Sequence, residues 1–315
     1  MPSVPAASFA IGLNAVILAV TDEAPRVLTL GGPADQAALP FGTLDPQSER
    51  TLELALRVRV REQTGLDLGY VEQLYTFGDR DRDPRVRRAG VRPLSIGYLA
   101  LVRETVAAAA ATWRDVYRFL PWEDWRGGRP RMLDERIVPA LLRWVEGTTA
   151  PRLRRERGDR ADITFGLASA GWDGKRVLER YELLYEAALV AESESEGVAT
   201  AAAAANLGEP MTLDHRRILA TALGRIRGKI EYRPVVFELM PPTFTLLQLQ
   251  RAVEALAGVE LHKGNFRRLV EKGGLVDGTG EQIHTGGRPA ELFRFRRGVL
   301  RERPTPGVGL PGTRR

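Results

Sequence analysis

The stretch from residue 241 to 297 constrains the fold most, because few structures fit its order of breakers, caps and apolar positions. The prolines at 241–242 end any helix before them. Thr245 is a good N-cap, and Gln248 stands three residues later, which is the spacing of a capping box. The apolar spacing that follows predicts a helix that ends near Gly258.

A second, shorter helix is predicted over residues 262–272, followed by a two-stranded wing. Phe266 falls on the apolar face of this helix and is expected in the core, whereas the polar side is mainly basic. The glycine-rich loop around 286–289 and the alternating residues 292–296 predict the wing. A helix, a short turn, a basic helix and a wing make a winged helix-turn-helix, a motif that lays its second helix in the major groove of DNA.

The positive charge of the chain is concentrated in the same stretch. The 315 residues carry a net charge of +6, from 46 basic and 40 acidic side chains. Residues 262–303 contain ten basic residues against five acidic ones, and two more arginines end the tail. The rest of the chain is therefore nearly neutral, at −1. A basic helix and wing are what contacts with DNA phosphates require.

The predicted DNA-contact residues lie on the second helix and in the wing. Arginine and asparagine can form paired hydrogen bonds with base edges, and lysine suits phosphate. The set is Lys263, Asn265, Arg267, Arg268, Lys272 and Arg288. Two alternatives stay open at this point: a solvated basic helix on another scaffold, and a surface that binds RNA.

The N-terminal part mixes strand-like and helical patterns. Strands are predicted over residues 10–20, 26–30, 71–77 and 94–102. A helix is predicted over residues 49–64 because Gly65 is a plausible C-cap, although residues 54–60 also alternate like a strand. Short strands around one or two helices indicate an α+β fold with an α/β/α sandwich.

Residues 146–210 have the composition of a helical connector. The charge run 152–157 and the alanine run 201–205 are typical of a solvated helix or linker, and residues 177–190 are predicted to form a helix with an apolar face. The predicted domains are residues 1–150, the connector 151–210, the winged helix-turn-helix 211–303, and a basic flexible tail 304–315.

Neither a metal site nor a membrane segment is expected. The chain has no cysteine, and its three histidines have no shared metal-ligand spacing. The apolar stretch 9–20 is too short to cross a bilayer, which needs ~20 residues, and no basic region precedes it. This stretch is expected to be a buried strand, and no cofactor is predicted.

Residues 42–66 resemble the Nudix box, a loop–helix–loop motif whose carboxylates bind a divalent metal in that family. Aligned on Gly65, the Glu-Glu position of the motif holds Glu62-Gln63, and the Arg-Glu position holds Val58-Arg59. One of the three principal metal carboxylates is kept and a guanidinium replaces another. Because a guanidinium repels a cation, the resemblance implies poor Mg²⁺ binding and no catalytic residue.

A wider similarity covers residues 9–145 and 211–297. The most specific segment is 72–85, which contains Tyr-Thr-Phe-Gly-Asp-Arg-Asp-Arg-Asp-Pro. The other similar segments are 94–102, 231–242, 265–268 and 286–290. In these segments the chain resembles the Nudix-related transcriptional regulators of the NrtR type. The resemblance implies a Nudix-like effector domain joined to a C-terminal winged helix-turn-helix.

The same resemblance implies a function. Members of this family dimerise and repress genes, often of NAD metabolism, until ADP-ribose or a related nucleotide sugar binds. A cytoplasmic homodimer that binds duplex DNA and such an effector is therefore expected. Arginines can hold a diphosphate, aromatic rings can stack on a base, and a carboxylate can accept from a ribose. The predicted effector residues are Phe41, Glu62, Phe77, Arg80, Arg82 and Arg85.

The alternative function is that of an active Nudix hydrolase with a basic accessory domain, which cleaves ADP-ribose-like nucleoside diphosphates. Glu49, Glu53 and Glu62 would then be the metal ligands. The departure from the motif at Val58-Arg59 is the feature that separates this hydrolase from a regulator that only binds the nucleotide.

Overall fold

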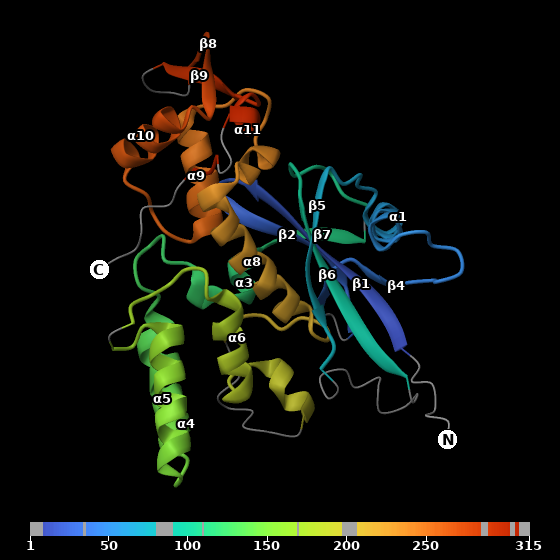
Figure 1. Cartoon of the computed structure of the whole chain (residues 1–315), viewed down its shortest axis with the longest axis vertical. Coiled ribbons are helices and arrows are strands. Elements are labelled where there is room, and N and C mark those ends of the chain that lie inside the picture. The colour runs from blue at the N-terminus through green and yellow to red at the C-terminus, as the bar shows by residue number, and fades with distance from the viewer. Residues whose placement is uncertain are drawn as a thin grey trace.

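The structure is a computed structural model of the whole chain (Figure 1). The residues it describes are 9–33, 36–79, 91–108, 110–168, 170–196, 207–284, 289–302 and 306–308. The predicted contacts Arg80, Arg82, Arg85 and Arg288 and nearly all of the tail 304–315 lie outside these ranges.

A mixed seven-stranded sheet forms the N-terminal half of the described chain. Its strands are β1 (Phe9–Thr21), β2 (Ala24–Gly31), β3 (Ala37–Ala38), β4 (Phe41–Thr43), β5 (Tyr70–Phe77), β6 (Arg92–Leu101) and β7 (Ala111–Asp115). The order is β3-β2-β1-β6-β5, with β4 paired to β1 and β7 paired to β2. The long pair β1–β6 is parallel and the other pairs are antiparallel. The strands predicted from the sequence are confirmed.

Helices cover both faces of this sheet, because the side chains of β1 alternate between two apolar cores. Ala15 and Ile17 face the core beneath α1 (Leu52–Thr64), while Val16 and Leu18 face the core that contains α8 (His215–Tyr232). Figure 1 shows α1 and α8 on opposite sides of the strands. The predicted α/β/α sandwich is confirmed, with its second helical layer supplied by a segment more than a hundred residues downstream.

The middle of the chain is helical and only partly solvated. Its elements are α3 (Val116–Phe119), η2 (Pro121–Glu123), η3 (Leu133–Ile137), α4 (Val138–Glu146), α5 (Pro151–Phe165), α6 (Val177–Glu186) and η4 (Ala191–Glu196). Helices α4 and α5 lie side by side and project from the body (Figure 1), and most of α5 is exposed, as its composition predicts. Helix α6 differs, because it packs on α8 and buries Tyr181, Leu183 and Leu184. No helix of the described ranges is long and apolar enough to cross a membrane.

The C-terminal part is the predicted winged helix-turn-helix. Its elements are η5 (Val235–Leu239), α9 (Leu246–Ala257), α10 (Lys263–Gly273), β8 (Val276–Ile283), β9 (Ala290–Phe295) and α11 (Val299–Glu302). Both hydrogen bonds of the capping box between Thr245 and Gln248 are present, and α9 ends at Gly258 in the left-handed conformation. Strands β8 and β9 pair as the wing. Phe266 is buried on α10, as predicted.

Candidate functional sites

Helix α10 presents the basic surface that the sequence predicts for DNA contact. Phe266 and Val270 are its buried anchors, whereas the predicted contact residues are exposed. The exposed residues are Lys263, Asn265, Arg267, Arg268 and Lys272. Arg268 donates a hydrogen bond from Nη2 to Asn265 Oδ1 at 3.3 Å, so the two residues best suited to base edges lie together.

The wing is fixed to the helices by backbone pairing and by aromatic packing. Phe244 and Phe293 exchange backbone N–H···O hydrogen bonds of 2.9 and 2.8 Å, which attach β9 to the entry of α9. The ring of Phe237 stacks on Phe295 with 4.3 Å between ring centroids. The wing is thereby held against η5 and the start of α9.

The backbone of Phe41, one of the predicted effector residues, is joined to the end of α1, which also carries Glu62. Gln63 brackets the backbone of Phe41, since its Oε1 accepts from Phe41 N at 3.1 Å and its Nε2 donates to Phe41 O at 2.7 Å. Glu62 is the neighbouring residue and is exposed. On its other side the ring of Phe41 meets His215 of α8 edge-on, at 5.2 Å between centroids. The ring of Phe41 therefore lies on the face of the sheet that α8 covers, opposite to α1.

The Nudix-like helix α1 does not offer a set of metal ligands. Arg59 donates from Nη2 to Glu49 at 3.2 Å and lies 4.0 Å from Glu62, and Arg57 donates to Glu53. Each carboxylate that a hydrolase would use is thus paired with, or close to, a guanidinium of the same helix. Among the described residues, no group of three His, Cys, Asp or Glu side chains could hold a metal ion. The Mg²⁺ of the Nudix family does not fit the residues present.

Phe77, another predicted effector residue, is buried beneath Arg217 of α8. Its ring is buried in the core between the sheet and α8, and the guanidinium of Arg217 stands 4.9 Å from its centroid. Arg217 also pairs with Asp79 at 2.5 Å, with Asp214 at 3.1 Å and with Glu182. A base could stack on Phe77 only if Arg217 moved away.

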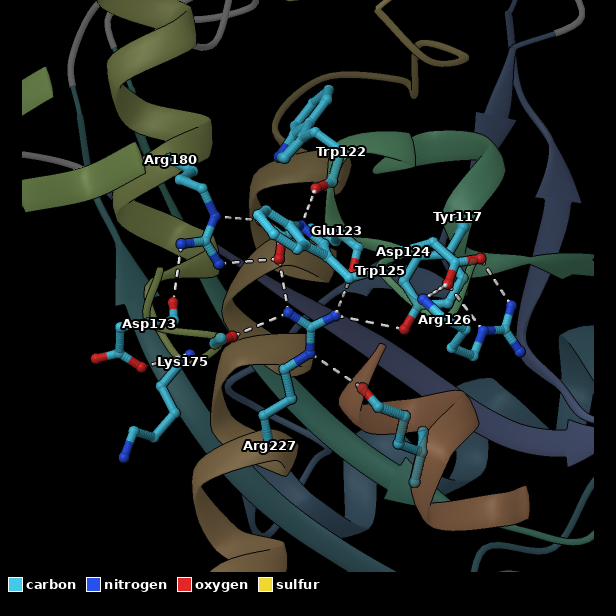
Figure 2. Close-up of polar contacts among 12 residues, drawn as sticks. Tyr117, Trp122, Glu123, Asp124, Trp125, Arg126, Asp173, Lys175, Arg180 and Arg227 are labelled. Atoms are coloured by element: carbon cyan, nitrogen blue, oxygen red, sulfur yellow. Dashed lines mark hydrogen bonds and ion pairs between the residues drawn. The ribbon is translucent and has the colours of Figure 1, made fainter. Parts of the chain in front are cut away.

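The sequence analysis missed a buried ion cluster at the centre of the molecule. Figure 2 shows Glu123 of η2 between Arg180 of α6 and Arg227 of α8. The carboxylate accepts from Arg180 Nε at 2.6 Å and Nη2 at 2.9 Å, and from Arg227 Nη1 at 2.6 Å. Side-chain exposure is 0% for Glu123 and Arg180 and 2% for Arg227. Burial alone would raise the pKa of Glu123, but the two guanidinium groups outweigh it and lower that pKa.

The remaining donors of the cluster are satisfied by backbone carbonyls. Arg180 Nη1 donates to Thr164 O and Asp173 O, and its guanidinium lies 3.8 Å from the ring centroid of Trp172. Arg227 donates to the backbone oxygens of Gly174, Glu123 and Leu256. The only signal in the sequence is a carboxylate flanked by tryptophans in the run 121–125, which pattern alone does not relate to any partner.

This cluster also holds the end of α9. Arg227 Nε donates to Leu256 O at 3.0 Å, and the Tyr117 hydroxyl donates to Ala255 O at 2.7 Å. Burial raises the pKa of Tyr117 to about 12, so this hydroxyl keeps its proton. A Cβ added at Gly258 would lie 2.4 Å from Glu123 O, so only glycine permits this approach. The orientation of the winged helix is therefore fixed against the sheet domain.

Comparisons with known proteins agree with this architecture. Residues 236–295 match the family model of the NrtR DNA-binding winged helix domain. The "ADPR responsive transcriptional repressor NtrR" of Acinetobacter baylyi is 39% identical over 85 residues, which are 27% of this chain and 34% of that protein. The match thus spans about a third of the length of this curated relative.

Two solved structures share the fold over nearly the whole chain. The crystal structure of Shewanella oneidensis NrtR complexed with a 27mer DNA has a TM-score of 0.56 at 19% identity, covering 92% of this chain and 95% of that one. A MutT/nudix family protein from Enterococcus faecalis has a TM-score of 0.52 at 14% identity, covering 94% and 89%. Residues 236–295 are thus similar to the NrtR winged helix domain, and the fold of the chain as a whole is similar to that of these two structures.

Proposed function

We propose that this chain is a ligand-responsive transcriptional repressor that binds duplex DNA through α10 and its wing. One observation carries the proposal: within the segment that matches the NrtR winged helix, the exposed side of α10 is basic and its apolar side is buried. The pair Asn265–Arg268 reads base edges, and Lys263, Arg267 and Lys272 add base or phosphate contacts.

The effector in this proposal is ADP-ribose or a related nucleotide sugar. The relative from Acinetobacter baylyi is described as responsive to ADPR, and this chain has a Nudix-type fold that carries the candidate contacts Phe41 on β4 and Glu62 on α1. The arginines at positions 80, 82 and 85 remain candidates for the diphosphate. NAD metabolism is the proposed field of regulation, as the family resemblance implies.

A continuous set of contacts runs from Phe41, through α8, to the end of α9. His215 begins α8, packs on Phe41 and accepts the backbone N–H of Leu39 at Nδ1, 3.0 Å away. The same helix carries Arg227, which holds Leu256 near the end of α9. A ligand that shifted Phe41 would therefore act on α8, and α8 is anchored to the winged helix.

The proposed regulator is a homodimer in the cytoplasm. A single winged helix contacts few base pairs, and two copies related by a twofold axis would double the length of the site. Repression and release then depend on the spacing of the two recognition helices.

Selection of bound duplexes from a random DNA pool tests the DNA-binding part of this proposal. The wild-type chain is expected to enrich a palindromic sequence, because a symmetric dimer presents the same helix to both half-sites. The Arg268→Ala variant is expected to enrich none, whereas Arg155→Ala, which alters an exposed arginine of α5 far from α10, enriches the wild-type sequence. Enrichment of the same sequence by Arg268→Ala would contradict the assignment of the recognition helix.

The hydrolase alternative is not favoured by the geometry of α1. The guanidinium groups of Arg57 and Arg59 lie against Glu53, Glu49 and Glu62, where metal ligands would be needed. Turnover of ADP-ribose at ordinary enzyme rates, ~1 per second or more, would restore that alternative.

A further inference from the structure

Arg59 lies among the carboxylates of α1, at the position where the Nudix motif carries an acid. We propose that its guanidinium is the resident cation of this surface and binds the diphosphate of the nucleotide effector directly, so that binding needs no divalent metal. The inference rests on the proposed nucleotide-binding function, and it identifies the group that neutralises the ligand.

The backbone around Arg59 is shaped to hold its side chain. A Cβ added at Gly42 would lie 3.0 Å from Arg59 Cδ and 3.1 Å from Nε, so the stem of Arg59 packs over a position without a side chain. Nη2 donates to Thr43 O and to Glu49 Oε1, both at 3.2 Å. Glu49 is only 15% exposed, so this pair anchors one side of the guanidinium.

The other side of the Arg59 guanidinium is open to a ligand. Among the described residues, Nη1 donates no hydrogen bond, and its nearest acid is Glu62 at 4.0 Å. The side chains of Arg59 and Glu62 are 34% and 62% exposed, so an oxyanion can reach Nη1 from solvent. Within the part of the chain that the structure describes, Nε is buried and has no hydrogen-bond partner. An arginine that is anchored through Nη2 and keeps the N–H donors of Nη1 available suits a diphosphate.

Arg59 also lies beside Glu62, another of the candidate contacts. Gly42, against which Arg59 packs, follows Phe41 in the chain, and Gln63 joins Phe41 to the end of α1 beside Glu62. The guanidinium of Arg59 and the exposed carboxylate of Glu62 thus lie on one surface, whereas the ring of Phe41 faces His215 on the other side of the sheet. The guanidinium and the carboxylate match a diphosphate and the hydroxyls of a ribose.

Calorimetric titration of the full chain with ADP-ribose, in EDTA and again in Mg²⁺, tests the proposal. The wild-type affinity is expected to agree within about twofold between the two buffers. Arg59→Gln is expected to bind about 10-fold or more weakly in both, because it removes a charge-assisted hydrogen bond. Arg59→Lys keeps the positive charge but loses the planar set of paired N–H donors, so its affinity for ADP-ribose is expected to lie between those of the wild type and Arg59→Gln.

Two further variants sharpen the test. Arg59→Glu, which places a third carboxylate beside Glu49 and Glu62, is expected to bind ADP-ribose measurably only when Mg²⁺ is added. Arg61→Gln is the matched control, because Arg61 lies on the same helix, is 69% exposed and pairs with Asp67. It should bind as the wild type does. Equal thermal midpoints for all the variants exclude a general loss of fold.

The outcomes separate this inference from the proposed function. Wild-type binding that disappears in EDTA, or an Arg59→Gln affinity equal to that of the wild type, would overturn the role of Arg59 and leave the chain a nucleotide sensor. Failure of the wild type to bind ADP-ribose in either buffer would overturn both this inference and the proposed effector. DNA selection by the same protein would stand in all cases.

Discussion

The Glu123→Leu variant is expected to lose about 3–5 kcal/mol in the free energy of unfolding, because it leaves two guanidinium groups buried without their counter-ion. Arg180 and Arg227 are at most 2% exposed, so water cannot replace the carboxylate. The contacts of Glu123 also join η2, α6 and α8, which belong to distant parts of the chain. Urea-induced unfolding, followed by circular dichroism, measures the loss.

A matched set of variants tells this effect apart from a simple packing defect. Replacing all three charges, as in Glu123→Leu with Arg180→Met and Arg227→Met, is expected to recover much of the loss, since no buried charge remains. Glu156→Gln removes the exposed partner of Arg152 on α5 and should change the stability by no more than about 0.5 kcal/mol. A triple variant as unstable as Glu123→Leu would show that charge imbalance is not the cause.

The second large effect concerns DNA. Replacing both Arg267 and Arg268 by alanine is expected to weaken binding to the selected duplex about 100-fold or more, because each arginine contributes ~1–3 kcal/mol of contact energy. The slope of log affinity against log salt should also fall by about one for each phosphate that the variant no longer neutralises. Fluorescence anisotropy at several salt concentrations gives both quantities.

The control for this experiment lies at the other end of the molecule. Arg154 and Arg155 are exposed on α5, and Figure 1 places α5 at the end of the molecule away from α10. The Arg154→Ala/Arg155→Ala variant loses the same charge and should keep the wild-type affinity. If both double variants weakened binding equally, the net charge of the chain and not the surface of α10 would account for the interaction.

The winged helix could be predicted from sequence because its determinants are local. A capping box needs Thr245 and Gln248 at a spacing of three, and the end of α9 needs a residue such as Gly258 that adopts a φ of 70°. The alternation that predicts the wing spans a few residues. None of these signals depends on what the segment packs against.

The buried cluster could not be predicted because its partners are distant. Glu123 and Arg180 are 57 positions apart, and Glu123 and Arg227 are 104 apart. Charged residues in a connector usually indicate solvent exposure, and that rule holds for α5 but fails for α6, where Arg180 has a buried partner. The composition of a segment gives the charge of each side chain, but it does not show which distant residue that side chain pairs with in the fold.

The candidate effector residues show the same limit. Gln63 joins the backbone of Phe41 to the end of α1, which carries Glu62, but the ring of Phe41 faces His215 of α8. Phe77 has an equally suitable side chain, yet α8 covers it with Arg217, which comes 140 positions later. The sequence around Phe77 does not reveal that Arg217 will lie over its ring. Nor does the sequence around Gly42 reveal that this glycine makes room for the side chain of Arg59.

Titration of the DNA complex with ADP-ribose tests the central claim most directly. The full-length wild-type chain is first bound to the selected duplex in EDTA, and the anisotropy of the labelled DNA is followed as ADP-ribose is added. We expect the affinity for DNA to fall about 10-fold or more, a coupling of ~1.4 kcal/mol or above, with the ADP-ribose recovered intact. An unchanged affinity at saturating ADP-ribose would contradict the account of this chain as a repressor released by ADP-ribose.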